Sequence, residues 1–159
     1  MKTERIIVVL DSNTILRGLS NPASASGDVI RLCDSRGVIV LFSKPVLAEY
    51  REFLADSAIR NHFPTIDTDV AVKALRRLNY VGEVCEVGSI HFEFDRDPDD
   101  AMFIELAIAG QATHIISHDK DLLSLPTSRS DAGKRFRQRL PGVRIVDAAT
   151  FLRQRPQLR

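Results

Sequence analysis

The chain has 159 residues, 44% of them hydrophobic and 27% charged, with a formal net charge of +1. This length suits one domain with its own core, and the composition is that of a globular protein rather than a disordered one. No apolar run approaches the ~20 residues of a membrane helix, and no signal-peptide cleavage site follows residues 1–5. We therefore expect a cytoplasmic protein without a membrane partner, folded as a single domain over residues 1–155 with a flexible tail at 156–159. Cys33 and Cys85 lie among apolar neighbours, which favours buried, reduced thiols over a disulfide or a metal site.

Strand-like and helix-like segments alternate along the chain. Short apolar runs, most of them rich in β-branched residues, predict strands at residues 5–10, 38–42, 84–87, 114–117 and 143–146. Helical spacing of apolar residues predicts helices over residues 25–35, 45–54, 67–78, 98–109, 119–123 and 147–153. The polar residues 124–142 predict a long loop or a frayed helix. Continuously apolar strands separated by helices indicate an α/β domain with a largely parallel sheet.

Two of the predicted strands run directly into an acidic residue. Asp11 follows the first strand in "IIVVLDSNTILRGL", and Asp119 follows a later one in "THIISHDKDLL". Ligands of open α/β sheets collect at the carboxyl ends of the strands. We therefore expect these two carboxylates to share a site.

Further acids follow the other strands. Asp97 and Asp100 stand in "RDPDDAMF", and Glu49 stands in "SKPVLAEYREFL". Each acid also has a structural interpretation, because Asp97 and Asp119 could cap helices, Asp100 suits a first helical turn, and Glu49 could be solvated surface.

Four carboxylates at one sheet edge would repel one another unless a divalent cation neutralised them. All-oxygen ligands suit Mg²⁺ or Mn²⁺. Zinc is not favoured, because the four histidines (His62, His91, His114 and His118) show no ligand spacing, and we place His118 at the rim of the site.

A basic stretch lies near the C-terminus. It consists of Arg129, Lys134, Arg135, Arg137 and Arg139. Such a cluster could neutralise the phosphates of a nucleic acid, or it could be the solvated surface of a loop.

The segments "VVLDSNTIL", "SKPVLAEY" and "RDPDDAMFIELAIAGQATHIISHDKDLLSL" together resemble the PIN-domain ribonucleases. Within that family the chain is most similar to the toxin components of prokaryotic toxin–antitoxin pairs, the VapC-like proteins. The resemblance covers residues 6–152 and implies a three-layer αβα fold with a central, mainly parallel sheet of four to five strands.

The resemblance also implies a site and its partners. It implies a metal-dependent endoribonuclease in which Mg²⁺ or Mn²⁺ activates water for in-line attack on a phosphodiester. The implied partners are an RNA substrate guided by the basic stretch, a cognate antitoxin protein and a second copy of the chain. Asp99 is a lesser candidate beside Asp97. The implied site comprises Asp11, Glu49, Asp100 and Asp119 as catalytic residues and metal ligands, Asp121 as a further ligand, and Asn13, Ser117 and Asp97 in support.

Other functional classes fit the motifs less well. A dehalogenase-like phosphatase needs a second acid at the position of Asn13, and a phosphoacceptor receiver domain needs an acidic pair after the first strand. A non-catalytic module that binds RNA or protein remains the alternative to an enzyme.

Overall fold

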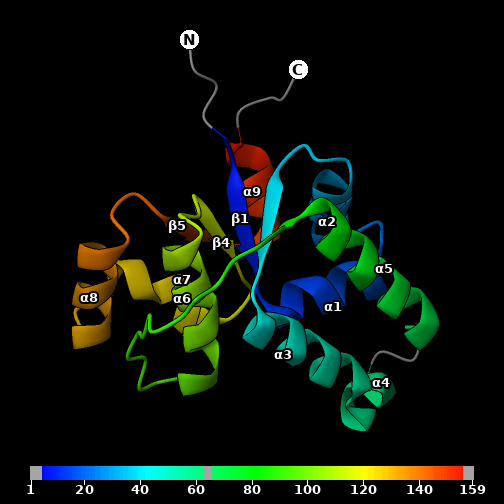
Figure 1. Ribbon diagram of the computed structural model, residues 1–159, viewed down its shortest axis with the longest axis horizontal. Coiled ribbons are helices and arrows are strands. Elements are labelled where there is room, and N and C mark those ends of the chain that lie inside the picture. The colour runs from blue at the N-terminus through cyan, green and yellow to red at the C-terminus, as the bar shows by residue number, and fades with distance from the viewer. Residues whose placement is uncertain (1–4, 63–65, 156–159) are drawn as a thin grey trace.

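The computed structural model describes residues 5–62 and 66–155 (Figure 1). Its strands are β1 (Ile7–Leu10), β2 (Ile39–Phe42), β3 (Glu83–Val84), β4 (His114–Ile116) and β5 (Arg144–Val146). The helices are α1 (Ser12–Ser20), α2 (Ala25–Asp34), α3 (Lys44–Ala55), α4 (Ser57–His62), α5 (Thr68–Val81), α6 (Ala101–Ala109), α7 (Lys120–Ser124), α8 (Asp131–Arg139) and α9 (Ala148–Gln154). Two 3₁₀ turns, η1 (Pro98–Asp100) and η2 (Leu125–Thr127), precede α6 and follow α7. The predicted tail at 156–159 lies outside the described residues.

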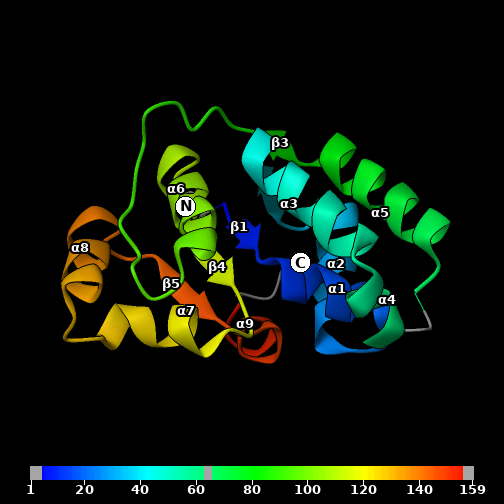
Figure 2. The ribbon, with the colours of Figure 1, turned by 90° about the horizontal axis from the view of Figure 1, so that it is seen from below.

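The five strands form one parallel sheet in the order β3-β2-β1-β4-β5. Helices cover both faces of this sheet, so the predicted three-layer α/β fold is confirmed. In Figure 2, α6 and α8 lie on one side of the sheet, whereas α1, α2, α3 and α5 lie on the other. Because both faces are covered, the central strand β1 is almost wholly buried and its sequence is continuously apolar.

The strand register aligns the ends of three neighbouring strands. Leu10 of β1 pairs with Ile116 of β4, which in turn pairs with Val146 of β5. The next residue of each strand therefore leaves the sheet at the same edge. Figure 2 looks at the molecule from this side.

The structure differs from the sequence-based expectation in one strand, two helices and one loop. The strand predicted at 84–87 is instead the two-residue β3, and residues 85–87 are not in a strand. Helix α1 was not predicted, although Asp11 caps it by accepting a hydrogen bond from the backbone N–H of Thr14. The short helix α4 was not predicted either. Residues 124–142 are not a long loop, because η2 and α8 occupy most of the segment, and Phe136 of α8 is buried in the core.

Residues 85–97 form the long connection between β3 and η1. In Figure 2 this connection passes around the outside of α6 and reaches α8. Phe92 and Phe94 anchor it in the core, and the backbone N–H of Phe92 donates to the Glu105 carboxylate at 3.0 Å. The segment is therefore held in place without regular secondary structure.

Both cysteines are free thiols. Cys33 is buried as predicted, whereas Cys85 is partly exposed, so the prediction of burial is wrong for Cys85. Within the part of the chain that the structure describes, none of the helices has the length and apolar character to span a bilayer.

Candidate functional site

Three carboxylates meet beside the C-terminal edge of the sheet. Asp97, Asp100 and Asp119 each place an oxygen so that all three atoms lie within 4.8 Å of one another. Asp97 precedes η1 and Asp100 is its last residue, directly before α6, whereas Asp119 follows β4. We call these residues the acid triad; all three are partly buried.

Only one residue of the acid triad makes a side-chain hydrogen bond that caps a helix. Asp119 caps α7, because one of its carboxylate oxygens accepts a hydrogen bond from the backbone N–H of Asp121 at 2.8 Å. Asp97 and Asp100 occupy the capping positions of η1 and α6, yet neither makes a side-chain capping hydrogen bond. The capping interpretation therefore holds for Asp119, whereas Asp97 occupies the N-cap position of η1 without a side-chain capping hydrogen bond.

The electrostatics of the acid triad are unfavourable without a cation. The pKa of Asp100 is raised from 3.8 to about 9, first by burial and then by the neighbouring carboxylates of Asp119 and Asp97. A carboxyl group in this setting holds a proton at neutral pH, since ionisation would add a third negative charge. A divalent cation could take the place of that proton.

Asp11 lies behind the acid triad and is linked to it through Ser117. Its side chain is 4% exposed, and one oxygen accepts from the backbone N–H and the hydroxyl of Thr14 at 2.7 and 2.6 Å. The other oxygen accepts from the hydroxyl of Ser117. The Ser117 oxygen in turn accepts from the backbone N–H of Asp119 at 3.0 Å. A buried hydrogen-bonded chain thus fixes the start of the loop that carries Asp119.

Glu49 faces the acids from α3. Its pKa is raised by burial, then by Glu52 and by Asp99 and Asp97 of the facing turn. Glu49 therefore contributes to the same negative field as the acid triad, although it is not one of the three residues whose oxygens converge.

Two other predicted site residues are not members of the acid triad. The carboxylate of Asp121 lies 3.7 Å from the guanidinium of Arg96 rather than in the acid triad. Asn13 is exposed on the first turn of α1.

His118, placed at the rim by sequence, has its ring Nε2 3.3 Å from the hydroxyl of Ser26. Burial lowers its pKa, and the charge of Arg17 lowers it further.

The predicted RNA-binding arginines of α8 are largely engaged with the protein's own backbone. Arg135 donates to the carbonyl of Glu93 at 3.1 Å, and Arg139 donates to that of His91 at 2.5 Å. Arg137 donates to the carbonyls of Pro126 and Ser128. Arg129 and Lys134 are exposed. Helix α8 itself lies on the far side of α6 from β1 in Figure 2.

Two buried supports of the site were missed by sequence reasoning. The Thr14 hydroxyl bridges the Asp11 carboxylate and the carbonyl of Ile116, at 2.6 and 3.1 Å. The Tyr50 hydroxyl donates to the carbonyl of Leu10, the last residue of β1. The spacing of Asp11 and Thr14 is that of a helix cap, and this signal would have revealed both α1 and the role of Thr14.

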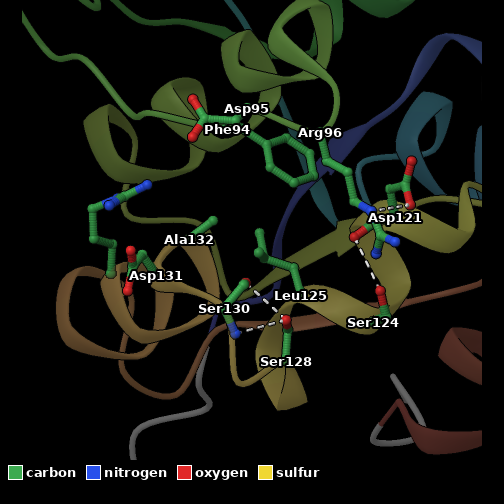
Figure 3. A pocket seen from close by; sticks show the side chains of 11 residues that line it. Phe94, Asp95, Arg96, Asp121, Ser124, Leu125, Ser128, Ser130, Asp131 and Ala132 are labelled. Atoms are coloured by element: carbon green, nitrogen blue, oxygen red, sulfur yellow. Dashed lines mark hydrogen bonds and ion pairs between the residues drawn. The ribbon is translucent and has the colours of Figure 1, made fainter.

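A pocket of about 500 Å³ is lined by residues that stand close in sequence to the acid triad (Figure 3). Two of its lining residues are Arg96, which precedes Asp97, and Asp121, which stands two residues after Asp119. Residues from η2 and α8 line the remainder. The pocket and the acid triad therefore share the same two chain segments.

Comparison with known proteins agrees with this geometry. The sequence profile described as "PIN domain" matches residues 7–121, which include β1 and all three residues of the acid triad. The chain belongs to the PIN-domain family. PIN domains are generally nucleases that use a divalent metal ion, and their fold is the one described above. The acid triad is this PIN domain's cluster of converging carboxylates.

The chain is also similar to an uncharacterized protein of Methanocaldococcus jannaschii. The two sequences are 28% identical over 125 residues, which cover 79% of this chain and 78% of the archaeal protein.

Proposed function

We propose that this PIN domain is a Mg²⁺- or Mn²⁺-dependent endoribonuclease that hydrolyses phosphodiester bonds in RNA. The observation that carries the proposal is the acid triad, in which Asp97, Asp100 and Asp119 converge within 4.8 Å. Convergence of like charges opposes folding, and the raised pKa of Asp100 records that opposition. A functional ligand of opposite charge, which neutralises the converging carboxylates, explains why they lie together.

The donor set fits a hard divalent cation. Asp97 and Asp100 have no capping hydrogen bond, and Asp119 uses one oxygen for its cap. The acid triad therefore offers several free carboxylate oxygens, the ligands that Mg²⁺ and Mn²⁺ prefer. When bound, such an ion supplies charge neutralisation and a lowered pKa for water next to a phosphodiester.

The remaining residues of the site orient the acid triad. Ser117 and Asp11 fix the backbone at Asp119, and Thr14 fixes Asp11. Glu49 adds negative charge on the α3 side. Hydrolysis adds water oxygen to phosphorus and breaks the bond from phosphorus to the departing ribose oxygen. The carboxylates take no covalent part in this reaction.

We further propose that the enzyme is the toxin of a toxin–antitoxin pair that acts on RNA in the cytoplasm. Support comes from the motif spacing shared with VapC-like toxins. In this role a cognate antitoxin protein would cover the acid triad and restrain cleavage, and two copies of the chain would form a dimer. Induced expression of the wild-type chain should arrest growth, whereas expression of Asp100→Asn should not.

Cleavage of a mixed single-stranded and structured RNA substrate tests the nuclease proposal. Purified wild-type protein with Mg²⁺ or Mn²⁺ should cut the mixture, and EDTA or the Asp100→Asn substitution should abolish cutting. Asp69→Asn is the matched control, because Asp69 is an exposed acid in the first turn of α5, on the other side of the sheet from α6.

The result that overturns the proposal is a folded protein that binds metal but cuts no RNA in the mixture. The chain would then be a non-catalytic PIN module that binds RNA or protein.

A further inference from the structure

The pocket beside the acid triad has the composition of a site for a flat polar ring. Its eleven lining residues are Phe94, Asp95, Arg96, Asp121, Ser124, Leu125, Ser128, Ser130, Asp131, Ala132 and Arg135. Figure 3 shows Phe94 and Leu125 in the middle, Arg96 and Asp121 towards one end, and Asp131 and Ala132 towards the other. We call this the side pocket. Its volume of about 500 Å³ is in the range of small-molecule sites.

The charges of the side pocket do not favour a phosphate group. Three aspartates and two arginines line it, so the formal charge of the lining is −1. A neutral heterocycle with hydrogen-bond donors and acceptors on its edge suits this mixture better than an anion. An unpaired nucleobase has this chemistry, and proteins bind such bases by stacking and by hydrogen bonds to the Watson–Crick edge.

The wall of the side pocket is preformed. Arg135 ties α8 to the backbone at Glu93, just before Phe94. Arg137 holds the turn at Pro126 and Ser128, and the hydroxyls of Ser128 and Ser130 bond to each other at 2.8 Å. These contacts explain why α8 is rich in arginine. A preformed wall lowers the entropy lost when a base is bound.

Asp131 is the carboxylate most suited to read the base. Asp121 is paired with Arg96 at 3.7 Å, and Asp95 points away from the Phe94 ring in Figure 3. Among the described residues, Asp131 has no hydrogen-bond or ion-pair partner for its side chain. A carboxylate pairs in bidentate fashion with adjacent donors, and guanine alone among the RNA bases presents two, N1–H and N2–H₂, side by side on that edge.

We propose that the side pocket binds an unpaired guanine next to the scissile phosphate, with Asp131 accepting hydrogen bonds from its Watson–Crick edge. The side chain of Arg96, which is 76% exposed, supplies a guanidinium that stacks on the ring. This inference rests on the proposed nuclease function, because it assigns a sequence preference to the same site.

Binding of mononucleotides tests the side pocket without any cleavage. ¹⁵N-labelled protein is titrated with GMP, AMP, CMP and UMP in the presence of Mg²⁺, and backbone amide shifts are followed. GMP should bind about tenfold more tightly than UMP, which is the selectivity of one bidentate pair. The shifts should centre on Ser128, Ser130 and Asp131.

Substitution of Asp131 provides the decisive comparison. In Asp131→Asn one acceptor oxygen becomes a donor, so the preference for GMP over UMP should disappear. Asp69→Asn is the matched control, since Asp69 also lies in the first turn of a helix and is exposed, and it should keep the preference. Equal affinity for all four nucleotides in the wild type, or an unchanged preference in Asp131→Asn, would overturn the proposal.

Mapping of cleavage sites separates failure of this inference from failure of the nuclease proposal. Wild-type cleavage of a random-sequence RNA library should be enriched about tenfold at sites next to guanine, and Asp131→Asn should lose that enrichment while still cutting. Cleavage without guanine enrichment rejects the side-pocket assignment and keeps the nuclease. Selective GMP binding without any cleavage rejects the nuclease and leaves a nucleotide-binding pocket.

Discussion

The acid triad and helix α8 are the two regions of the molecule where like charges gather, and they have opposite local surroundings. In α8, Arg135, Arg137 and Arg139 each donate to backbone carbonyls of neighbouring segments. In the acid triad, the nearest ionisable neighbours of Asp100 are the carboxylates of Asp119 and Asp97. The basic cluster therefore has a structural explanation within the chain, and the acidic cluster does not.

This contrast distinguishes a charge cluster that stabilises the fold from one that requires a ligand. An arginine that bonds to a carbonyl stabilises the fold and lets two segments pack. A half-buried carboxylate that faces two others opposes folding unless something outside the chain compensates it. We therefore assign the catalytic role to the acid triad, and we assign to α8 a structural role in the wall of the side pocket.

The largest expected effect separates Asp119 from Asp121, two acids that sequence reasoning placed in one metal site. Asp119→Asn keeps an oxygen to cap α7 but loses a charged ligand, so we expect at least about a hundredfold loss of metal-dependent RNA cleavage. Asp121→Asn, which loses only its pairing with Arg96, should keep the metal affinity of the wild type. An RNA cleavage assay measures the loss of activity, and Mn²⁺ titration followed by thermal unfolding compares the metal affinity of the two variants. An equal loss of the Mn²⁺-induced Tm rise in both would place Asp121 among the ligands.

A second prediction concerns the buried chain behind the acid triad. Ser117→Ala removes the donor to the buried Asp11 carboxylate and the acceptor for the partly buried Asp119 N–H. We expect a loss of about 2 kcal/mol in the free energy of unfolding. Urea denaturation measures this, with Ser35→Ala as control, because the exposed Ser35 hydroxyl bonds only to the carbonyl of Leu32. A change below about 0.5 kcal/mol for Ser117→Ala would mean that water replaces the hydroxyl.

The third prediction is the pH dependence of the metal-free protein. The pKa of Asp100 is about 9 in the folded chain and 3.8 ordinarily, so between these values the folded state holds a proton that the unfolded state has released. The free energy of unfolding therefore falls as pH rises from about 4 to 9.

Because solvent screens the half-buried Asp100 carboxylate, we expect a fall of about 1–2 kcal/mol rather than the full linkage energy. Denaturation in EDTA across this range measures it. Asp100→Asn should reduce the slope, and saturating Mn²⁺ should stabilise the wild type most at high pH. A slope that persists unchanged in Asp100→Asn would assign the proton to another group.

Much of the fold could be predicted from the sequence, because its strands are short, continuously apolar and separated by helices. The end of β1 at Leu10 and the start of α3 near Pro45 both carry local signals. Helix α1 was missed because the polar residues Ser12 and Asn13 resemble a loop, although Asp11 and Thr14 form a cap.

The site was harder to predict, because it depends on distances between segments far apart in sequence. Strand ends indicate an edge but not which oxygens converge there, so the sequence could not show that Asp97 meets Asp100 and Asp119. The orientation of Asp121 depends on Arg96, which belongs to a different segment. No local pattern reveals that pairing.

The smallest expected effect tests the other half of the comparison, the structural interpretation of α8. Arg139→Gln removes the hydrogen bond to the carbonyl of His91 and should lower the free energy of unfolding by about 1 kcal/mol. Lys134→Gln should leave the free energy of unfolding within about 0.5 kcal/mol of the wild type, because Lys134 is an exposed surface residue of the same helix.

The salt dependence of RNA binding distinguishes a structural role of α8 from a role in phosphate binding. A lower salt slope in Lys134→Gln would show that α8 contacts phosphates in addition to building the side pocket, and an unchanged slope leaves α8 as scaffold.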